Sequence, residues 1–404
     1  MSGLRAQRLA ARRAARRRAV GRGVLVAVAS VVVAVGTATG MLSALGGRDG
    51  SGEVRPASAG DSPGRVGVRG LPSGLGAPSA APSAPASLSA SAEVSGSPSS
   101  SPKASKPSPD KPRPTAVGRL YRHPSSQVLD WVQDNPHDWR ADVIRSRIAD
   151  RPAAVWFADY TPATITSRVR AVTARAAAQG RVPVVVAYAV PDRDCGGASQ
   201  GGAPDLGAYD AWIDRFAAGL GSREVIVVLE PDAIAQSDCL PEAGRADRFA
   251  SLARAGRVLK AANPKARVYY DAGHSGWNPA VQQAALLKRA GAASAASSDG
   301  IFSNVSNFHS TSAEIAYDRQ VLAALGGPPG LGAVIDTSRN GNGAPPDGEW
   351  CDPAGRRIGR APTLDTGEAR IDAYLWVKLP GESDGCKGAP GTFSASYAYD
   401  LASP

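Results

Sequence analysis

Residues Val182 to Gly202 read VPVVVAYAVPDRDCGGASQGG, and this segment indicates the architecture of the chain most clearly. The first half is apolar apart from Tyr188, which is the pattern of a strand buried on both faces in a parallel sheet. Pro191 ends this strand, and charged residues and a glycine-rich turn follow at once. Because parallel strands present functional side chains at their carboxyl ends, we expect an active site directly after Val190.

A second segment repeats this design at Val225 to Leu229, where an all-apolar strand runs into Glu230, Pro231 and Asp232. Asp194 follows the first strand in the same way that Asp232 follows the second. Two carboxyl groups at the ends of neighbouring buried strands can serve as an acid and base pair.

Helix and strand signals alternate from Arg119 onward, which predicts an α/β fold with a parallel sheet. At this length we expect a closed or nearly closed β/α barrel of the TIM type. An open doubly wound sheet is the alternative, but no GxGxxG or GxxxxGK[ST] turn follows any expected strand. The expected helices are 125–135, 164–180, 209–220, 246–263, 279–290 and 313–325. The expected strands are 153–157, 182–190, 225–229, 267–270, 300–305, 332–336 and 373–377.

The net charge of this 404-residue chain is +10, but eight arginines lie between Arg5 and Arg22. The remainder is near neutral and indicates no nucleic-acid partner. Residues 23–47 carry no charge and are long enough to cross a bilayer, with the Arg-rich end in the cytoplasm. We therefore expect residues 1–47 to be an Arg-rich cytoplasmic segment plus a signal peptide or a signal anchor. The rest is then extracellular, either secreted or tethered to the membrane.

Residues 48–115 consist mainly of Ser, Pro, Ala and Gly. This composition cannot bury enough apolar surface to fold, so it predicts a disordered linker that acts as a spacer. Residues 116–404 are enough for one barrel-sized domain with a large core, and we expect a monomer.

Four cysteines fall in this domain, namely Cys195, Cys239, Cys351 and Cys386. In an exported protein an even count predicts two disulfides, for which three pairings are possible. We favour the sequential pairing, in which each bond closes a loop of about 35 to 45 residues and contributes about 4 kcal/mol. Zinc is disfavoured because the spacings are too wide for CxxC ligand pairs, and we expect no metal and no cofactor.

Polar and aromatic residues follow one expected strand after another, where barrel active sites lie. A lone Asp in a loop is most often a helix cap or an ion-pair partner, but the repetition indicates a site. The set comprises Trp156, Asp159, Tyr188, Arg193, Asp194, Glu230, Asp232, Asp271, His274, Trp277, Asn304, Asn307, His309, Asp336, Arg339, Asn340, Lys378, Glu382 and Asp384.

Tryptophans beside polar loop residues are typical of a cleft that binds sugars, because flat indole faces pair there with carboxylates and amides. The tryptophans in such places are Trp156, Trp277 and Trp350. We expect Trp212 and Trp376 to be core residues instead. His274 is interpreted as a hydrogen-bonding partner, since no second His lies at metal-ligand spacing.

Hydrolysis of a glycosidic bond needs one carboxyl group that stays protonated and a second that assists water or acts as nucleophile. Asp232 follows an apolar strand and lies close to other carboxylates in sequence. Burial and like charge are therefore expected to raise its pKa, which suits the role of acid.

Five motifs then make the chain resemble a known family. They are VVAYAVPDRDC, VIVVLEPDAI, YYDAGHSGW, IDTSRNGNGAPPDGEWCDP and WVKLPGESDG. In this order they resemble the motifs of glycoside hydrolase family 6, the cellulases that cleave β-1,4-glucan with inversion. The match covers about residues 125–393, and it implies a distorted β/α barrel with a substrate cleft across its top.

The resemblance implies roles for the matched residues. Asp232 would be the general acid, and Asp194 would raise the pKa of that acid and stabilise the oxocarbenium charge. Tyr188 would press on the distorted sugar, and Asp384 would be the candidate base, with water able to relay the proton. The positions that match sugar contacts are Trp156, His274, Trp277, Asn307, Trp350, Lys378 and Glu382. The sequential cysteine pairing also matches the family.

Two positions depart from the family pattern. Gln200 stands where a small residue, often Ser, usually lies in the mobile loop that positions the catalytic water, which affects the placement of that water. Phe308 and His309 stand where Tyr and another residue type are common, so one sugar subsite is expected to differ.

These observations predict an inverting β-1,4-glucanase whose partner is a β-glucan polysaccharide. We expect it to cleave internal bonds, as an endoglucanase, because no segment after Trp350 is long enough to cover the cleft. Exo action of the cellobiohydrolase type is the alternative mode. A second hypothesis, prompted by Gln200 and the tether, is a non-catalytic or weakly active glycan-binding protein of the cell envelope. A third is hydrolysis of a different envelope glucan.

Overall fold

The computed structural model describes residues 119–403. The expected signal or anchor segment at 1–47 and the expected linker at 48–115 lie outside the described residues. Between residues 119 and 403, no helix combines the length and the apolar character needed to cross a membrane.

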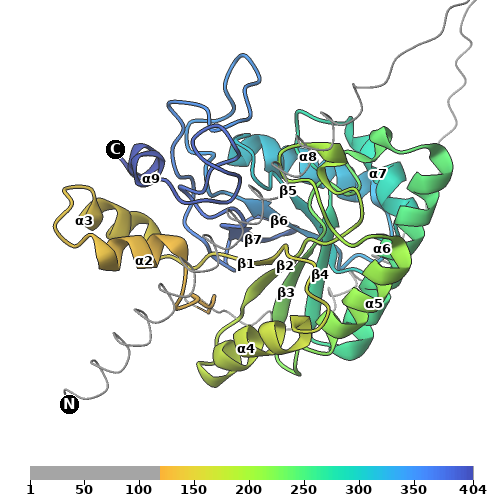
Figure 1. The fold of residues 1–404 in the computed structure, drawn as a ribbon. Coiled ribbons are helices and arrows are strands. Elements are labelled where there is room, and N and C mark those ends of the chain that lie inside the picture. The colour runs from red at the N-terminus through yellow and green to blue at the C-terminus, as the bar shows by residue number, and fades with distance from the viewer. Residues whose placement is uncertain (1–118, 404) are drawn as a thin grey trace, which may run out of the picture. The chain divides into compact units, whose positions relative to one another are not determined.

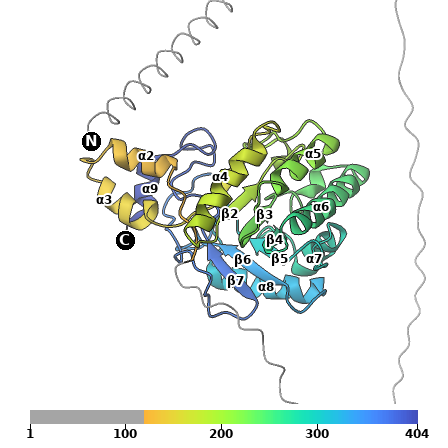
Figure 2. The same ribbon diagram turned by 90° about the horizontal axis from the view of Figure 1, so that it is seen from below.

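Seven parallel strands form one sheet, and their order across the sheet is their order along the chain. Figures 1 and 2 show the sheet curled at the centre, with helices α4 to α8 around its outside. The strands are β1 (Val155–Phe157), β2 (Val184–Ala187), β3 (Val225–Leu229), β4 (Ala266–Asp271), β5 (Gly300–Ser303), β6 (Gly332–Asp336) and β7 (Ile371–Leu375).

Hydrogen bonds connect the first and last strands, although β1 and β7 are not neighbours in the sheet. The backbone N–H of Ala154 donates to the carbonyl of Trp376 at 2.9 Å. The indole Nε1 of Trp156 donates to the carbonyl of Val377 at 2.7 Å. The expectation of a distorted, nearly closed parallel barrel is thus confirmed.

The helices are α2 (Gln127–Asp134), α3 (Ala141–Ile144), α4 (Ile165–Ala178), α5 (Leu206–Ala217), α6 (Glu242–Ala262), α7 (Ala280–Arg289), α8 (Thr311–Leu325) and α9 (Ala395–Ala402). A π-helical turn, Arg145–Ala149, continues α3. Every helix expected from the sequence is present. Helix α5 begins three residues before the expected start because the Asp205 carboxylate accepts a hydrogen bond from the Ala208 N–H at 2.7 Å and caps the helix.

Helices α3 and α9 were not expected from the sequence. Helix α3 and the π-helical turn pack against α2, and α9 packs against α3 and that turn. We call this group the α2–α9 lobe; Figures 1 and 2 show α2, α3 and α9 together beside the barrel. The apolar cluster of the lobe includes Trp376 and Leu379, which follow β7. Such short helices depend on tertiary packing, which sequence periodicity does not reveal.

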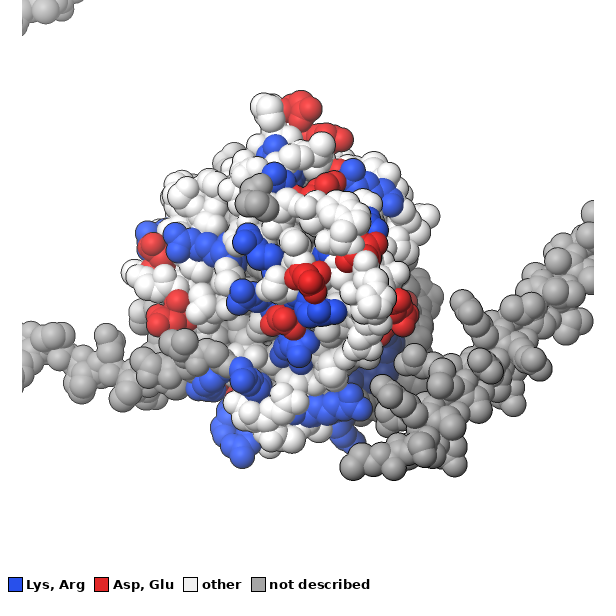
Figure 3. All heavy atoms as spheres, turned by 90° about the vertical axis from the view of Figure 1, so that its left-hand side faces the viewer, with Lys and Arg blue, Asp and Glu red and all other residues white. Residues whose placement is uncertain are grey.

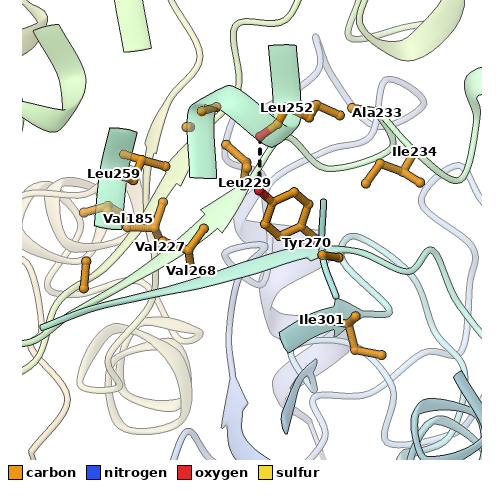
Figure 4. Close-up of a cluster of buried hydrophobic side chains, with 14 of the residues drawn as sticks. Val185, Val227, Leu229, Ala233, Ile234, Leu252, Leu259, Val268, Tyr270 and Ile301 are labelled. Atoms are coloured by element: carbon orange, nitrogen blue, oxygen red, sulfur yellow. Dashed lines mark hydrogen bonds between the residues drawn. The ribbon is translucent and has the colours of Figure 1, made fainter. Parts of the chain in front are cut away.

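Alternate residues of the strands enter two separate apolar clusters. Val185 and Val227 face the surrounding helices, and Figure 4 shows this layer, in which the Tyr270 hydroxyl donates to the Leu252 carbonyl at 3.1 Å. Val186 faces the opposite way, into the barrel interior. Both faces of the sheet are therefore buried, as the unbroken apolar runs predict.

Trp212 and Trp376 are both buried, so their assignment to the core is confirmed. Strand β2 is shorter than expected, since its regular pairing ends at Ala187. The next backbone N–H groups, those of Ala189 and Val190, donate instead to the Glu230 carboxylate at 2.9–3.0 Å.

Candidate active site

A cleft of about 1400 Å³ lies where the strands present their carboxyl ends. Its walls include residues that follow β1, β2, β3, β4, β5 and β7. Every residue that the sequence assigned to catalysis or sugar binding lines this one cleft. These residues are Trp156, Tyr188, Asp194, Asp232, His274, Trp277, Asn307, Trp350, Lys378, Glu382 and Asp384.

Asp232 lies at the end of β3 with its carboxyl group toward the cleft. Burial raises its pKa well above the usual value, and the charges of Asp271 and Asp194 raise it further, in that order. No hydrogen bond to its carboxyl group comes from a side chain within residues 119–403. The carboxyl group therefore has little to stabilise its ionised form.

Asp271, at the end of β4, is fully buried beside Asp232. It accepts hydrogen bonds from the backbone N–H groups of Ile234 at 3.1 Å, Ala235 at 2.8 Å and Gly273 at 2.9 Å. Burial raises the pKa of Asp271 as well, but these N–H groups oppose that shift. Since N–H donors favour the carboxylate form, we assign the charge to Asp271 and the proton to Asp232.

The family resemblance implies that Asp194 is the charged neighbour of Asp232. Asp194 does contribute, but Asp271 contributes more. This neighbour could have been inferred, because β3 and β4 pair in parallel with Leu229 opposite Tyr270, and adjacent strands lie only about 5 Å apart.

Glu230 is not a cleft residue, although it belongs to the polar set from the sequence. It is fully buried, and burial raises its pKa to about 7. Its carboxylate holds the backbone after β2 through the N–H groups of Ala189 and Val190. We interpret Glu230 as a residue that fixes the end of β2 in place.

The loop after β2 folds back on itself next to the cleft. The Asp194 carboxylate accepts a hydrogen bond from the Ser199 N–H at 2.6 Å, and Nε of Arg193 donates to the Ser199 carbonyl at 2.8 Å. The Arg193 guanidinium also lies 4.5 Å from the ring centroid of Tyr188. At Gly197 a Cβ atom would lie 2.6 Å from the Asp194 carboxylate, so this closed turn requires glycine. Gln200 lies on the same loop and lines the cleft.

Two disulfides tie down the loops around the cleft. Cys195 is bonded to Cys239, which links the loops after β2 and β3. Cys351 is bonded to Cys386, which links the loops after β6 and β7. The sequential pairing is thus confirmed.

Asp384 lies in a buried cluster of charges. Its Oδ2 is 2.6 Å from Nη1 of Arg339, and its Oδ1 is 3.4 Å from Nζ of Lys378. Arg339 is fully buried, and its guanidinium lies 4.4 Å from the ring centroid of Phe308. The backbone N–H of Asp352 donates to Asp384 at 3.2 Å. These contacts hold the carboxylate in one orientation at the edge of the cleft.

The tryptophans of the cleft differ in exposure. Trp277 is 37% exposed and Trp350 is 56% exposed, so both indole rings face solvent. Trp156 is held by its bond to Val377 and by an edge contact with Tyr188 at 5.3 Å between ring centroids. The cleft thus offers both fixed and accessible aromatic faces.

Glu382 connects the cleft to the α2–α9 lobe. Its Oε1 accepts a hydrogen bond from Nε2 of Gln127, the first residue of α2, at 3.3 Å. Burial raises the pKa of Glu382 to about 7, while Lys378 acts in the opposite direction.

Besides Glu230, Asp271 and Arg339, three further polar residues of the predicted set do not line the cleft, namely Asn304, Asp336 and Asn340. Asp336 accepts hydrogen bonds from the backbone N–H groups of Ser338 and Lys378 at 2.9 and 3.0 Å. Asn304 and Asn340 both donate to the carbonyl of His309, at 3.1 and 3.0 Å. All three are buried and shape the loops that carry the cleft residues.

His274 and His309 stack in the wall of the cleft, with ring centroids 4.3 Å apart and planes 19° apart. Burial and the neighbouring His309 lower the pKa of His274 to about 3, and burial lowers the pKa of His309. The pair is therefore neutral near pH 7. Within residues 119–403 no group of three or more His, Cys, Asp or Glu residues is placed to hold a metal ion.

Acid is expected to destabilise the fold through His274. The pKa of His274 is about 3 in the folded state and about 6.5 in the unfolded state. Between these two pH values the unfolded state therefore binds a proton at His274 and the folded state does not. Stability therefore falls as the pH drops through this window, by at most about 1.4 kcal/mol per pH unit. Urea unfolding of the wild type and of His274→Asn, at pH 7 and in mild acid, measures the effect. We expect a smaller acid-induced loss in the variant; equal losses would contradict the assignment.

Several residues around the cleft have left-handed backbone conformations that glycine usually adopts. The φ angles are 56° at Asp194, 52° at Glu230 and 69° at Asp232. Such conformations cost about 1–3 kcal/mol each and occur most often at functional sites. These residues turn the chain sharply in the loops after β2 and β3, where Asp194 and Asp232 lie.

A family model described as Glycosyl hydrolases family 6 matches residues 113–401. The chain belongs to glycosyl hydrolase family 6. This family 6 chain is 53% identical over 284 residues to Endoglucanase 1 of Streptomyces sp. (strain KSM-9), a match that covers 70% of this chain and 77% of that protein. It is 50% identical over 284 residues to Endoglucanase A of Thermobispora bispora, covering 70% of this chain and 61% of that protein.

The family 6 fold is also found in a solved structure. The endoglucanase Cel6 from Mycobacterium tuberculosis, in complex with methyl-cellobiosyl-4-deoxy-4-thio-β-D-cellobioside, is 39% identical. The match has a TM-score of 0.65 and covers 71% of this chain and 97% of that chain. The family resemblance inferred from the five motifs is therefore confirmed.

Proposed function

We propose that the chain is an inverting endo-β-1,4-glucanase that hydrolyses internal bonds of cellulose or a cellulose-like glucan. The observation that carries this proposal is the placement of Asp232 beside Asp271 and Asp194 in the lining of a cleft that also contains tryptophans, where burial and these two charges raise the pKa of its carboxyl group. A proton held there near neutral pH can be given to the oxygen of a leaving sugar. Three similar proteins are named endoglucanases, which agrees with this activity.

Asp232 is the general acid in this proposal, and two groups act on it or on the sugar. Asp194 lies near enough to raise the pKa of Asp232 and to stabilise positive charge on the sugar ring. Tyr188, buried between Trp156 and Arg193, provides a firm surface against which the sugar at the cleavage point is distorted.

Asp384 is the proposed proton acceptor for the attacking water. Because Arg339 and Lys378 neutralise the charge of its carboxylate, we propose that it acts through a chain of water molecules and positions the nucleophile. Gln200 lies on the folded loop after β2 and lines the cleft. Its long amide side chain stands where the family usually has a small residue, and we propose that it changes the placement of the same water.

The sugar chain is proposed to lie along the tryptophans and polar side chains of the cleft. Trp277 and Trp350 are accessible from solvent, so a long chain can enter from the side instead of being threaded from one end. This supports endo action over the exo mode of a cellobiohydrolase. The residues proposed to contact sugars are Trp156, His274, Trp277, Asn307, Trp350, Lys378 and Glu382.

Export is part of the same proposal. An uncharged segment at residues 23–47 behind an Arg-rich start, together with two disulfides, suits an extracellular enzyme. We propose that the chain is secreted or held at the membrane by that segment, with the linker at 48–115 as spacer.

Release of reducing ends tests the activity. The purified chain should release them from carboxymethyl cellulose or mixed-linkage glucan, with a rapid loss of viscosity and with products in the α configuration. Binding of oligosaccharide without hydrolysis over long incubation would instead establish the non-catalytic hypothesis. Products of the β configuration would exclude inversion.

A further inference from the structure

Trp139 is an exposed indole outside the cleft. In residues 119–403 the large hydrophobic side chains that are exposed are Trp139 at 72%, Trp277 at 37%, Val281 at 74% and Trp350 at 56%. Two of these three tryptophans line the cleft, and Trp139 does not. Because single exposed hydrophobic residues are common, exposure alone does not assign it a role.

The backbone that carries Trp139 is held on both sides. The Asp138 carboxylate pairs with the Arg140 guanidinium through Oδ1 to Nε at 2.9 Å and Oδ2 to Nη2 at 2.8 Å. Asp138 also accepts hydrogen bonds from the backbone N–H groups of Arg140 and Ala141, each at 2.9 Å. This ion pair lowers the pKa of Asp138 to about 2. Trp139 is thus presented from a fixed turn at the start of α3.

The indole ring itself is supported from behind. Tyr399 of α9 meets it at 4.5 Å between ring centroids with planes at 69°, and the Arg140 guanidinium lies 5.8 Å from its centroid. Arg140 also contacts Trp131 and donates to the Ser396 hydroxyl at 3.0 Å. A ring fixed in this way while 72% exposed loses little conformational entropy when a ligand covers it.

The surroundings of Trp139 favour a sugar as its occupant. A stable protein interface buries about 800 Å² on each partner. In the described part of the α2–α9 lobe, Trp139 is the one large hydrophobic residue that is exposed, so this surface does not favour a protein partner. Figure 3 shows this side of the molecule, with positive and negative groups interspersed among uncharged surface over its middle and upper part and mainly positive groups at its lower edge. A β-linked glucose unit has a flat face of C–H groups and a rim of hydroxyls, which suits an indole beside a carboxylate, a guanidinium and a hydroxyl.

The position of the ring relative to the cleft suits a polymer. Gln127, at the start of α2, lines the cleft, and α2 is eight residues long, which is about 12 Å. Trp139 follows the far end of this helix. The same rigid lobe therefore carries a wall of the cleft and the exposed ring.

We propose that Trp139, backed by Tyr399 and flanked by Asp138 and Arg140, is a second binding site for β-glucan chains outside the cleft. This inference rests on the proposed function for the class of polymer. The site would hold the enzyme on a polymer surface while the cleft releases and takes up chains.

Adsorption to amorphous cellulose tests the proposal. The full-length chain carries Asp232→Asn to prevent cleavage, and cellotetraose is added to saturate the cleft, so that the remaining adsorption reports the second site. Trp139→Ala should lower the partition onto the polymer about fivefold, comparable with the loss of one aromatic contact. Trp139→Tyr should restore most of it. Val281→Ala, which removes an equally exposed hydrophobic side chain from α7, is the matched control and should change nothing.

The outcomes separate this inference from the proposed function. Unchanged adsorption of Trp139→Ala, or an equal loss with Val281→Ala, would overturn the second site while leaving hydrolysis untouched. A raised KM of Trp139→Ala for cellotetraose hydrolysis, in the chain that keeps Asp232, would also overturn it, because Trp139 would then act through the cleft. If the parent chain hydrolyses no soluble glucan and binds none, the proposed function fails together with the inference.

Discussion

Replacement of Asp232 by Asn is expected to lower kcat on β-1,4-glucan by about 10²–10⁴-fold, the contribution typical of a general acid. The sugar oxygen is a poor leaving group unless it receives a proton. Asp232 lies in the cleft and can supply this proton, because burial and the charges of Asp271 and Asp194 raise the pKa of its carboxyl group. Steady-state kinetics on soluble mixed-linkage glucan give the change in kcat and in KM. KM should change little, because the amide retains the shape of the carboxyl group.

A substrate with an activated leaving group separates the acid role from a structural role. An aryl β-cellobioside with a dinitrophenolate leaving group needs no proton, so Asp232→Asn should cleave it at a rate much closer to that of the wild type. Asp238→Asn, an exposed aspartate further along the same loop, is the matched control and should behave as the wild type does on both substrates. Equal losses on both substrates would remove Asp232 from the acid role.

Replacement of Asp384 by Ala is expected to lower the free energy of unfolding by about 3–5 kcal/mol, and to reduce hydrolysis strongly even where the variant is folded. Arg339 is fully buried and pairs with Asp384 at 2.6 Å, so the variant leaves a buried positive charge without its main partner. Urea unfolding measures the first effect and steady-state kinetics at low temperature measure the second. Arg339→Met combined with Asp384→Ala should recover part of the stability but none of the activity.

An exposed ion pair provides the control for this loss. Arg254 on α6 and Asp214 on α5 pair at 2.8 Å near the surface. Because solvent screens such pairs, Asp214→Ala should cost about 0–1 kcal/mol. If Asp384→Ala cost no more than Asp214→Ala, the buried cluster would not be what holds the loop after β7. If hydrolysis persisted in a folded Asp384→Ala variant, Asp384 would not assist the water.

The parallel barrel and its central carboxylates could be predicted because their signals are local. An apolar run that ends abruptly in charged residues indicates both a buried strand and its carboxyl end, as at β2 and β3. Glu230 is an exception to this pattern. It follows β3 as Asp232 does, but its side chain turns into the protein and binds the backbone of Ala189 and Val190.

The remaining features depend on contacts between distant parts of the chain. Asp384 and Arg339 are separated by 45 residues, and nothing in either motif indicates that they pair. The same is true of Tyr399, which comes from a helix that the sequence analysis did not expect and lies against Trp139. A lone Trp in a polar segment has no periodicity, so whether it is buried or exposed depends entirely on tertiary structure.

The protonation state of Asp232 tests the central claim most directly. Carbon-13 NMR of the chain labelled at aspartate carboxyl groups, with Asp232→Asn used to assign the signal, follows this group through a pH titration. We predict that the Asp232 signal titrates well above the usual range of about pH 4, and that Asp271→Asn shifts the transition to lower pH. A signal that is already fully ionised below about pH 4 would leave the cleft without a proton donor and contradict the proposed mechanism.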